Sequence, residues 1–154
     1  MRVEAEIAVA RPRPEVFSYL KDAARLPEYM TEFELVEQVS EGPPRVGTQY
    51  RYRMARGQAK GTFEWTKFVP SSHLAWSGPA VKAGLGSMQP AGWWDLSDGP
   101  GGSTTVKLVM APEPGGLFKV LAPFMAAGMR KSNEQSLANL KARLEGADAP
   151  PPPG

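Results

Sequence analysis

The chain has 154 residues, of which 16 are glycine and 16 are proline, and 42% are hydrophobic. This length and composition suit one domain with one sizeable core, and the frequent turn residues argue against a long helical bundle. There is no cysteine, His73 is the single histidine and the net charge is +2. These features exclude disulfides and metal sites built on cysteine or several histidines, and they do not indicate a nucleic-acid-binding protein.

The first third of the chain predicts a strand followed by two short helices. Residues 3–9 alternate between apolar and polar side chains, which is typical of a half-buried strand. Residues 14–20 start with a proline and an acidic residue and then carry apolar side chains at helical spacing, so we expect a short helix there. Residues 23–26 predict a second one, ending near Pro27.

The middle of the chain predicts a run of antiparallel strands. Its segments alternate in polarity or are rich in β-branched residues, and turn residues separate most of them. They are residues 35–40, 48–54, 61–69, 73–77, 93–96 and 104–110. Residues 78–92 have no clear period, and we expect either the mobile lid of a cavity or a long hairpin. The result is an antiparallel sheet of about six or seven strands.

The last part of the chain changes to helical spacing. Apolar residues recur with this spacing from Leu117 to Leu144, and Pro123 should kink the helix or divide it into two pieces. We therefore predict an α+β fold in which a curved sheet wraps around a long C-terminal helix, with a ligand cavity between them. The domain should span residues 1–146, and residues 147–154 should form a disordered, proline-rich tail.

Several segments together resemble a known protein family. They are residues 14–20, 26–29, 46–50, 63–65, 74–76, 101–106 and, most familiar of all, 136–145. The chain resembles the SRPBCC (START-related) superfamily over residues 2–145, and within it the polyketide cyclase/dehydrase-like group. The resemblance implies the helix-grip fold. The superfamily contains lipid and hormone binders, aromatase/cyclases, hydrolases and resistance proteins, so the resemblance leaves the activity open.

Aromatic and methionine side chains are the candidates for lining the cavity. Aromatic rings stack on flat ligands, and methionine adapts to apolar ones, although each of these residues could equally belong to an ordinary core. The candidates are Tyr50, Tyr52, Trp65, Trp76, Trp94, Met110, Phe124, Met125 and Met129. Trp93 and Trp94 are neighbours on a strand and face opposite sides, so at most one of them can line the cavity.

Six residues are the candidates for catalysis: Glu64, Asp95, Arg51, Arg53, Tyr50 and Tyr52. The two arginines alternate with the two tyrosines along one strand. If the tyrosines face the helix, the arginines only contribute solubility, whereas the opposite register would let an arginine polarise a substrate carbonyl. We expect both carboxylates on the convex, solvated face. His73 should be a surface residue, because it alternates with Leu74 and Trp76 on its strand, and no G-x-S-x-G motif supports a catalytic triad with it.

Three functions fit this pattern. The first is a module that binds an apolar, aromatic or polyketide- or lipid-like molecule without turnover. The second is a cofactor-free, polyketide cyclase/aromatase-like enzyme that folds its substrate and moves protons by general acid–base catalysis. The third is a protein that sequesters a natural product or confers resistance to it. The shortage of ionisable residues on the predicted concave face favours binding.

The location and partners can also be anticipated. The sequence has no apolar run long enough to span a membrane and no apolar signal segment near its start. We therefore expect a cytoplasmic protein, a monomer or weak dimer, that uses no metal or cofactor and has a small hydrophobic molecule as its partner.

Overall fold

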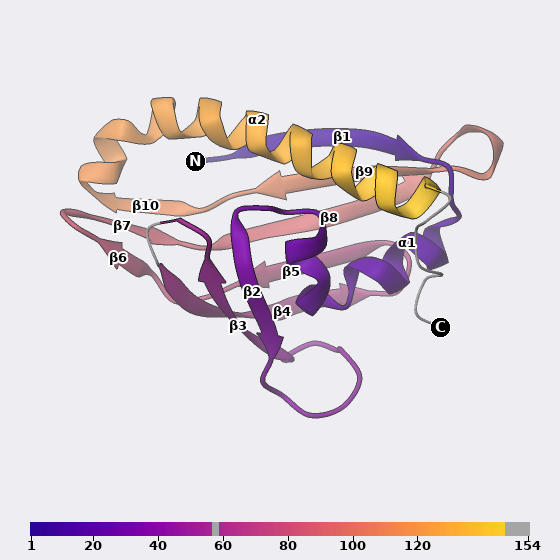
Figure 1. Ribbon diagram of the computed structural model, residues 1–154, viewed down its shortest axis with the longest axis horizontal. Coiled ribbons are helices and arrows are strands. Elements are labelled where there is room, and N and C mark those ends of the chain that lie inside the picture. The colour runs from indigo at the N-terminus through magenta and orange to yellow at the C-terminus, as the bar shows by residue number, and fades with distance from the viewer. Residues whose placement is uncertain (57–58, 147–154) are drawn as a thin grey trace.

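A curved, seven-stranded antiparallel sheet forms most of the fold (Figure 1). The computed structural model describes residues 1–56 and 59–146. In sheet order, the strands are β1 (Val3–Val9), β9 (Thr104–Met110), β8 (Ala91–Asp98), β5 (His73–Ser77), β4 (Lys60–Val69), β3 (Gln49–Met54) and β2 (Phe33–Gln38). The predicted number of strands and their antiparallel pairing are confirmed.

A smaller, three-stranded sheet extends one end of the molecule (Figure 1). It contains β10 (Glu113–Gly116), β7 (Gly86–Gln89) and β6 (Val81–Ala83), in that order. The sequence did not decide whether residues 78–92 form a lid or a hairpin. In the structure they form the β6–β7 hairpin and the beginning of β8.

Two short helical elements and one long helix lie where the sequence predicts them, but the long helix differs from the prediction in one respect. Two short ones, α1 (Arg13–Leu20) and the 3₁₀ helix η1 (Ala23–Glu28), follow β1, and the 3₁₀ turn η2 (Pro100–Gly102) precedes β9. The last is α2 (Leu117–Glu145), one continuous helix that contains Pro123, so of the two effects predicted for this proline, a kink or a division into two pieces, the division is wrong. The side chains around Pro123 are exposed, so water can reach the carbonyl that loses its N–H partner there.

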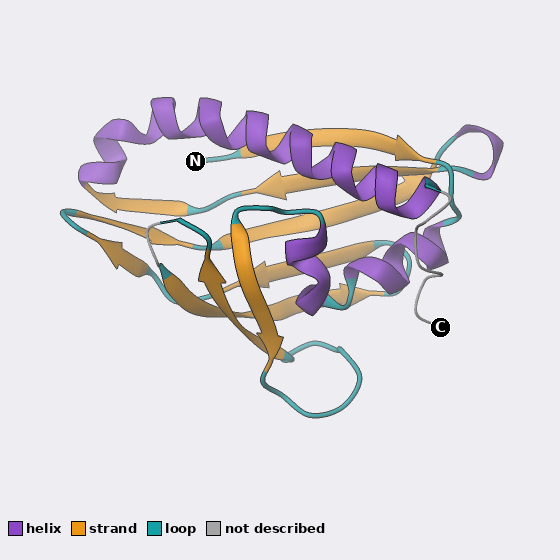
Figure 2. Cartoon of the chain, viewed as in Figure 1, coloured by secondary structure: helices purple, strands orange, loops and turns teal. Residues whose placement is uncertain are grey.

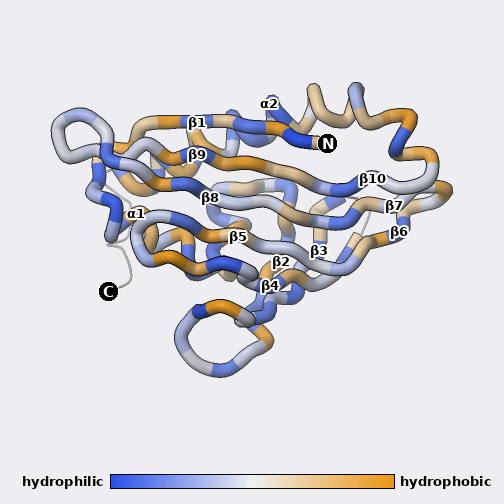
Figure 3. The backbone as a smooth tube through the Cα atoms, turned by 180° about the vertical axis from the view of Figure 1, so that it is seen from behind, coloured by the Kyte–Doolittle hydropathy of each residue, from blue (hydrophilic) through white to orange (hydrophobic). Residues whose placement is uncertain are grey.

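The long helix lies across the concave face of the sheet, as in the predicted helix-grip fold (Figure 2). The second half of α2 provides Leu137, Leu140 and Leu144, which are at most 3% exposed and belong to the hydrophobic core. Alternating hydropathy is visible along the strands in Figure 3, and it explains why one face of each strand supplies the core. The predicted tail, residues 147–154, lies outside the described residues.

Candidate ligand-binding site

Side chains do not fill all the space between the concave face of the sheet and α2. They leave a cavity of about 190 Å³, which is larger than the ~150 Å³ apolar cavity known to hold benzene. The lining residues are Leu20, Leu26, Met30, Phe33, Tyr52, Met54, Phe63, Trp65, Trp76, Met88, Pro90, Ala91, Trp94, Met110, Pro112 and Met129. The cavity therefore has room for a small aromatic molecule.

Strand alternation decides which aromatic residues reach the cavity. On β4, Trp65 points inward and is only 2% exposed. On β8, Trp94 lines the cavity. Its neighbour Trp93 lies on the convex face, where its indole N–H donates to Asp95 (3.1 Å) and the Arg2 guanidinium lies 5.1 Å from its ring centroid. Only one of the two adjacent tryptophans faces inward, as the period of a strand requires.

A glycine makes room for another tryptophan of the lining. A β-carbon at Gly92 would lie 2.5 Å from the Trp76 ring and 2.5 Å from the carbonyl oxygen of Val109. The bare backbone at Gly92 thus allows the Trp76 indole to lie against β8, with its ring centroid 6.5 Å from that of Trp94. A glycine within a strand often marks such a close approach. The glycine at position 92 could therefore have indicated this close approach from the sequence alone.

Tyr50 does not line the cavity, although it shares a strand face with Tyr52. Its hydroxyl donates to the carbonyl of Lys21 (3.2 Å) and accepts from the Trp65 indole N–H (3.2 Å). Its ring stacks on Phe63 with the centroids 5.2 Å apart. Tyr50, which the sequence predicts as a ligand-binding residue, therefore lies behind the lining. The end of α1 covers it, and this tertiary contact has no local sequence signal.

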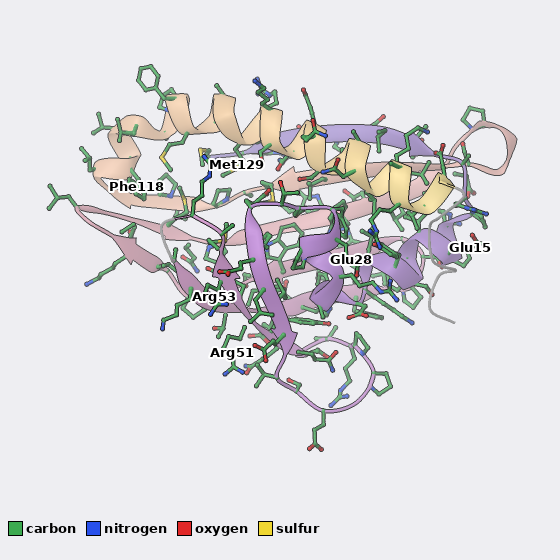
Figure 4. All side chains as sticks on the ribbon, viewed as in Figure 1. Glu15, Glu28, Arg51, Arg53, Phe118 and Met129 are labelled. Carbon is green, nitrogen blue, oxygen red and sulfur yellow. The ribbon has the colours of Figure 1, made fainter. Side chains whose placement is uncertain are left out.

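Two of the three candidates on α2 also lie outside the lining. Phe124 is 79% exposed on the outer face of the helix, because at 3.6 residues per turn it points about 140° away from Met129. Met125 shares the helix face of Met129 but lies one turn nearer the helix start, and it is not a lining residue. Met129 alone reaches the cavity from α2, beneath the helix in Figure 4.

The arginine candidates lie on the convex face. Arg51 pairs with Glu37 at 3.5 Å and Arg53 pairs with Glu34 at 2.9 Å, between side chains that are 47–63% exposed. Figure 4 shows both arginines on the sheet side remote from α2. The register that turns the tyrosines inward is therefore the one observed, and neither arginine can polarise a molecule held in the cavity.

The two carboxylate candidates and the histidine are also outside the cavity. Glu64 alternates with inward-facing neighbours and is half-buried on the opposite face of β4. Asp95 is 46% exposed and forms an ion pair with His73, which is 25% exposed. Both the expected convex position of the carboxylates and the expected surface position of the histidine agree with the structure.

The lining offers few polar groups. Among the described residues, it contains no Asp, Glu, Lys, Arg or His, and nowhere in residues 1–56 and 59–146 do three or more His, Cys, Asp or Glu come together as metal ligands would. Tyr52 supplies a hydroxyl. Burial raises the pKa of Tyr52, so this hydroxyl stays protonated at neutral pH and can donate a hydrogen bond.

Sequence reasoning missed much of the wall that lies away from the central strands. Met30 and Phe33 come from the connection after η1 and the start of β2, and Met88 comes from residues 78–92, for which the sequence did not decide between a lid and a hairpin. Met54 could have been found, because it shares the inward face of β3 with Tyr52. The others are brought together by chain crossings that local patterns do not encode.

A curved sheet that holds a mostly apolar cavity against one long helix defines a helix-grip, START-like protein. The sequence matches the family described as "Polyketide cyclase / dehydrase and lipid transport" over residues 1–145, and the chain belongs to this family. The predicted family is therefore confirmed. No curated protein is similar enough in sequence to count as a relative.

Solved structures with this fold are similar over nearly the whole chain. The TTHA0849 protein of Thermus thermophilus has a TM-score of 0.76 and 22% identity, over 96% of this chain and 99% of that one. A START superfamily protein from Mycobacterium smegmatis has a TM-score of 0.71 and 13% identity, over 94% and 97%. The Zhui aromatase/cyclase from a Streptomyces species has a TM-score of 0.67 and 17% identity, over 97% and 99%. At these identities the similarity establishes the fold alone.

Proposed function

We propose that this protein binds a small, predominantly apolar molecule with a flat or aromatic portion in the cavity between the sheet and α2, and that it does so without chemical turnover. The observation that carries the proposal is the lining itself, which in the described chain consists of aromatic, aliphatic and methionine side chains. Pockets of this kind hold apolar ligands, and a few polar groups fix their orientation. The family description, which includes lipid transport, is consistent with such a ligand.

The arrangement of the lining suggests how the ligand lies. Trp76 and Trp94 are neighbours in the lining, with ring centroids 6.5 Å apart, and Met129 joins the lining from α2. A flat ring system can contact the indoles on one side and the adaptable thioether on the other. The Tyr52 hydroxyl supplies a hydrogen-bond donor, so a carbonyl or hydroxyl oxygen on the ligand would help to orient it.

The cyclase alternative has less support from the site. A cyclase that moves protons needs an acid or base within hydrogen-bond reach of its substrate. Among the described lining residues, Tyr52 is the one ionisable group, and its raised pKa keeps it protonated, so that it is not available as a base. A sequestering or resistance protein would share the same cavity, and the binding test below applies to it equally.

The test is a titration with N-phenyl-1-naphthylamine, a neutral aromatic dye that becomes fluorescent in apolar surroundings. We expect saturable binding to the wild-type protein. The variant Met129→Trp should weaken binding about tenfold or more, because the larger side chain fills space that the dye would occupy. Met125→Trp is the matched control, since Met125 lies on the same helix one turn away and does not line the cavity.

Equal dye affinity in both variants would show that the dye does not use the cavity and would contradict the proposal. Met110→Phe repeats the test from the β9 wall, in case Met129→Trp fails to fold. Circular dichroism of each variant establishes that the fold is retained.

A further inference from the structure

An apolar patch is exposed where the β6–β7 hairpin meets the start of α2. It consists of Leu85, Leu117, Val120, Leu121 and Phe124, which are 85%, 47%, 72%, 38% and 79% exposed. The described residues include nine exposed large hydrophobic side chains, and five of them are in this patch. Figure 3 shows hydrophobic segments at this end of the molecule. Such clustering exceeds the scattered exposure that is normal for a protein surface.

The apolar patch stands on a well-packed base. The backbone N–H of Leu117 donates to the carbonyl of Leu85 (3.1 Å), which joins the helix start to the hairpin. On the inner side, the Phe118 ring packs directly against Gly86, where no β-carbon would fit (Figure 4). The exposed side chains are therefore on the outer face of an element that is anchored by its inner face. The packing of the inner face therefore keeps these side chains exposed.

Basic residues predominate in the two segments that carry the apolar patch. Residues 81–89 and 113–131 contain four basic residues and one acidic residue, Glu113. The basic residues, all exposed, are Lys82, Lys119, Arg130 and Lys131. Exposed apolar side chains flanked by cations are typical of helices that lie in the interface of an anionic bilayer.

We propose that the apolar patch docks on the surface of a membrane that contains anionic lipids. A second copy of the chain is a poorer occupant, because a face-to-face contact between two such patches would bring their basic residues together. No helix in the described part of the chain is long and apolar enough to cross a membrane. The contact is therefore peripheral, with the apolar side chains inserted among the lipid headgroups and the basic side chains on their phosphates.

Docking in this orientation would place the first half of α2 between the bilayer and the cavity. Met88 of β7 and Met129 of α2 line the cavity, and both belong to elements adjoining the patch. The docking inference goes beyond the proposed function and does not depend on it, because the patch residues do not line the cavity.

The test is co-sedimentation of the protein with vesicles of phosphatidylcholine alone and of an equal mixture of phosphatidylcholine and phosphatidylglycerol. We expect binding to the mixed vesicles, and a loss of binding when salt is raised from about 0.1 M to about 0.5 M. The double variant Val120→Ser/Phe124→Ser should lower the bound fraction about tenfold. Val46→Ser/Val69→Ser is the matched control, because these valines are 58% and 50% exposed but lie outside the patch.

Failure of the wild-type protein to bind the mixed vesicles, or equal binding by the two double variants, would overturn the inference. So would a wild-type dimer in analytical ultracentrifugation that Val120→Ser/Phe124→Ser dissociates, since the patch would then join two copies. The dye titration separates the two proposals. Val120→Ser/Phe124→Ser should bind N-phenyl-1-naphthylamine like the wild type. Met129→Trp should lose dye binding and retain vesicle binding, because this substitution affects only the cavity.

Discussion

Two buried tyrosines of the core differ in whether their hydroxyls have hydrogen-bond partners. The hydroxyl of Tyr29 is buried and has no hydrogen-bond partner among the described residues. Burial raises the pKa of Tyr29 well above its usual value, so its hydroxyl remains protonated. Tyr50, in contrast, bonds through its hydroxyl to both the Lys21 carbonyl and the Trp65 indole.

This difference predicts opposite effects of removing the two hydroxyls. Tyr29→Phe should leave the free energy of unfolding unchanged or raise it by up to about 1 kcal/mol, because it removes an unsatisfied buried group. Tyr50→Phe should lower the free energy of unfolding by about 1 kcal/mol, because it removes a satisfied one. Urea denaturation measures both values. A larger loss in Tyr29→Phe than in Tyr50→Phe would show that the Tyr29 hydroxyl has a partner in solution.

At the scale of elements, α2 has two halves with different roles. The first half overhangs the cavity and exposes its outer apolar side chains, whereas the second half is packed into the core. Near its end, the Arg143 guanidinium donates to the Tyr19 hydroxyl (2.9 Å) and to Glu28 (2.6 Å), which joins α2 to α1 and η1. The helix is thus held firmly at its C-terminal half.

The two halves should respond differently to the same substitution. Leu140→Ala should lower the free energy of unfolding by about 2–5 kcal/mol, because Leu140 is 0% exposed and its removal leaves a cavity. Leu121→Ala should change the free energy of unfolding by about 0.5 kcal/mol or less, because Leu121 is 38% exposed on the outer face. Urea denaturation measures the free energy of unfolding of both variants. Similar losses in both variants would mean that Leu121 is covered in solution.

Elements with a strong local period could be predicted from the sequence, and those set by tertiary contacts could not. The alternation at residues 3–9 and 104–110 locates β1 and β9 correctly, because each strand has one buried face. Pro123 does not divide α2, a possibility that the sequence left open, since its exposed turn tolerates the lost hydrogen bond. For the site, alternation places Tyr52, Trp65 and Trp94 inward, but only the fold shows that α1 covers Tyr50.

At the scale of the whole molecule, the cavity follows from how a curved sheet meets one long helix. The sheet order brings β1 and β9 from opposite ends of the chain into one layer, and α2 then packs along β1 and across the concave face (Figure 1). The second half of the helix fills this face, whereas beneath the first half the lining side chains do not meet. The cavity and the apolar patch consequently lie on opposite faces of the same helix half.

This geometry makes a crystal structure of the protein soaked with N-phenyl-1-naphthylamine the most direct test of ligand binding in the cavity. We predict electron density for the naphthyl ring inside the cavity, between the indoles of Trp76 and Trp94 and the side chain of Met129. An empty cavity, with the dye bound only on the outer face of α2 against Val120 and Phe124, would contradict the proposal that the cavity binds an apolar ligand.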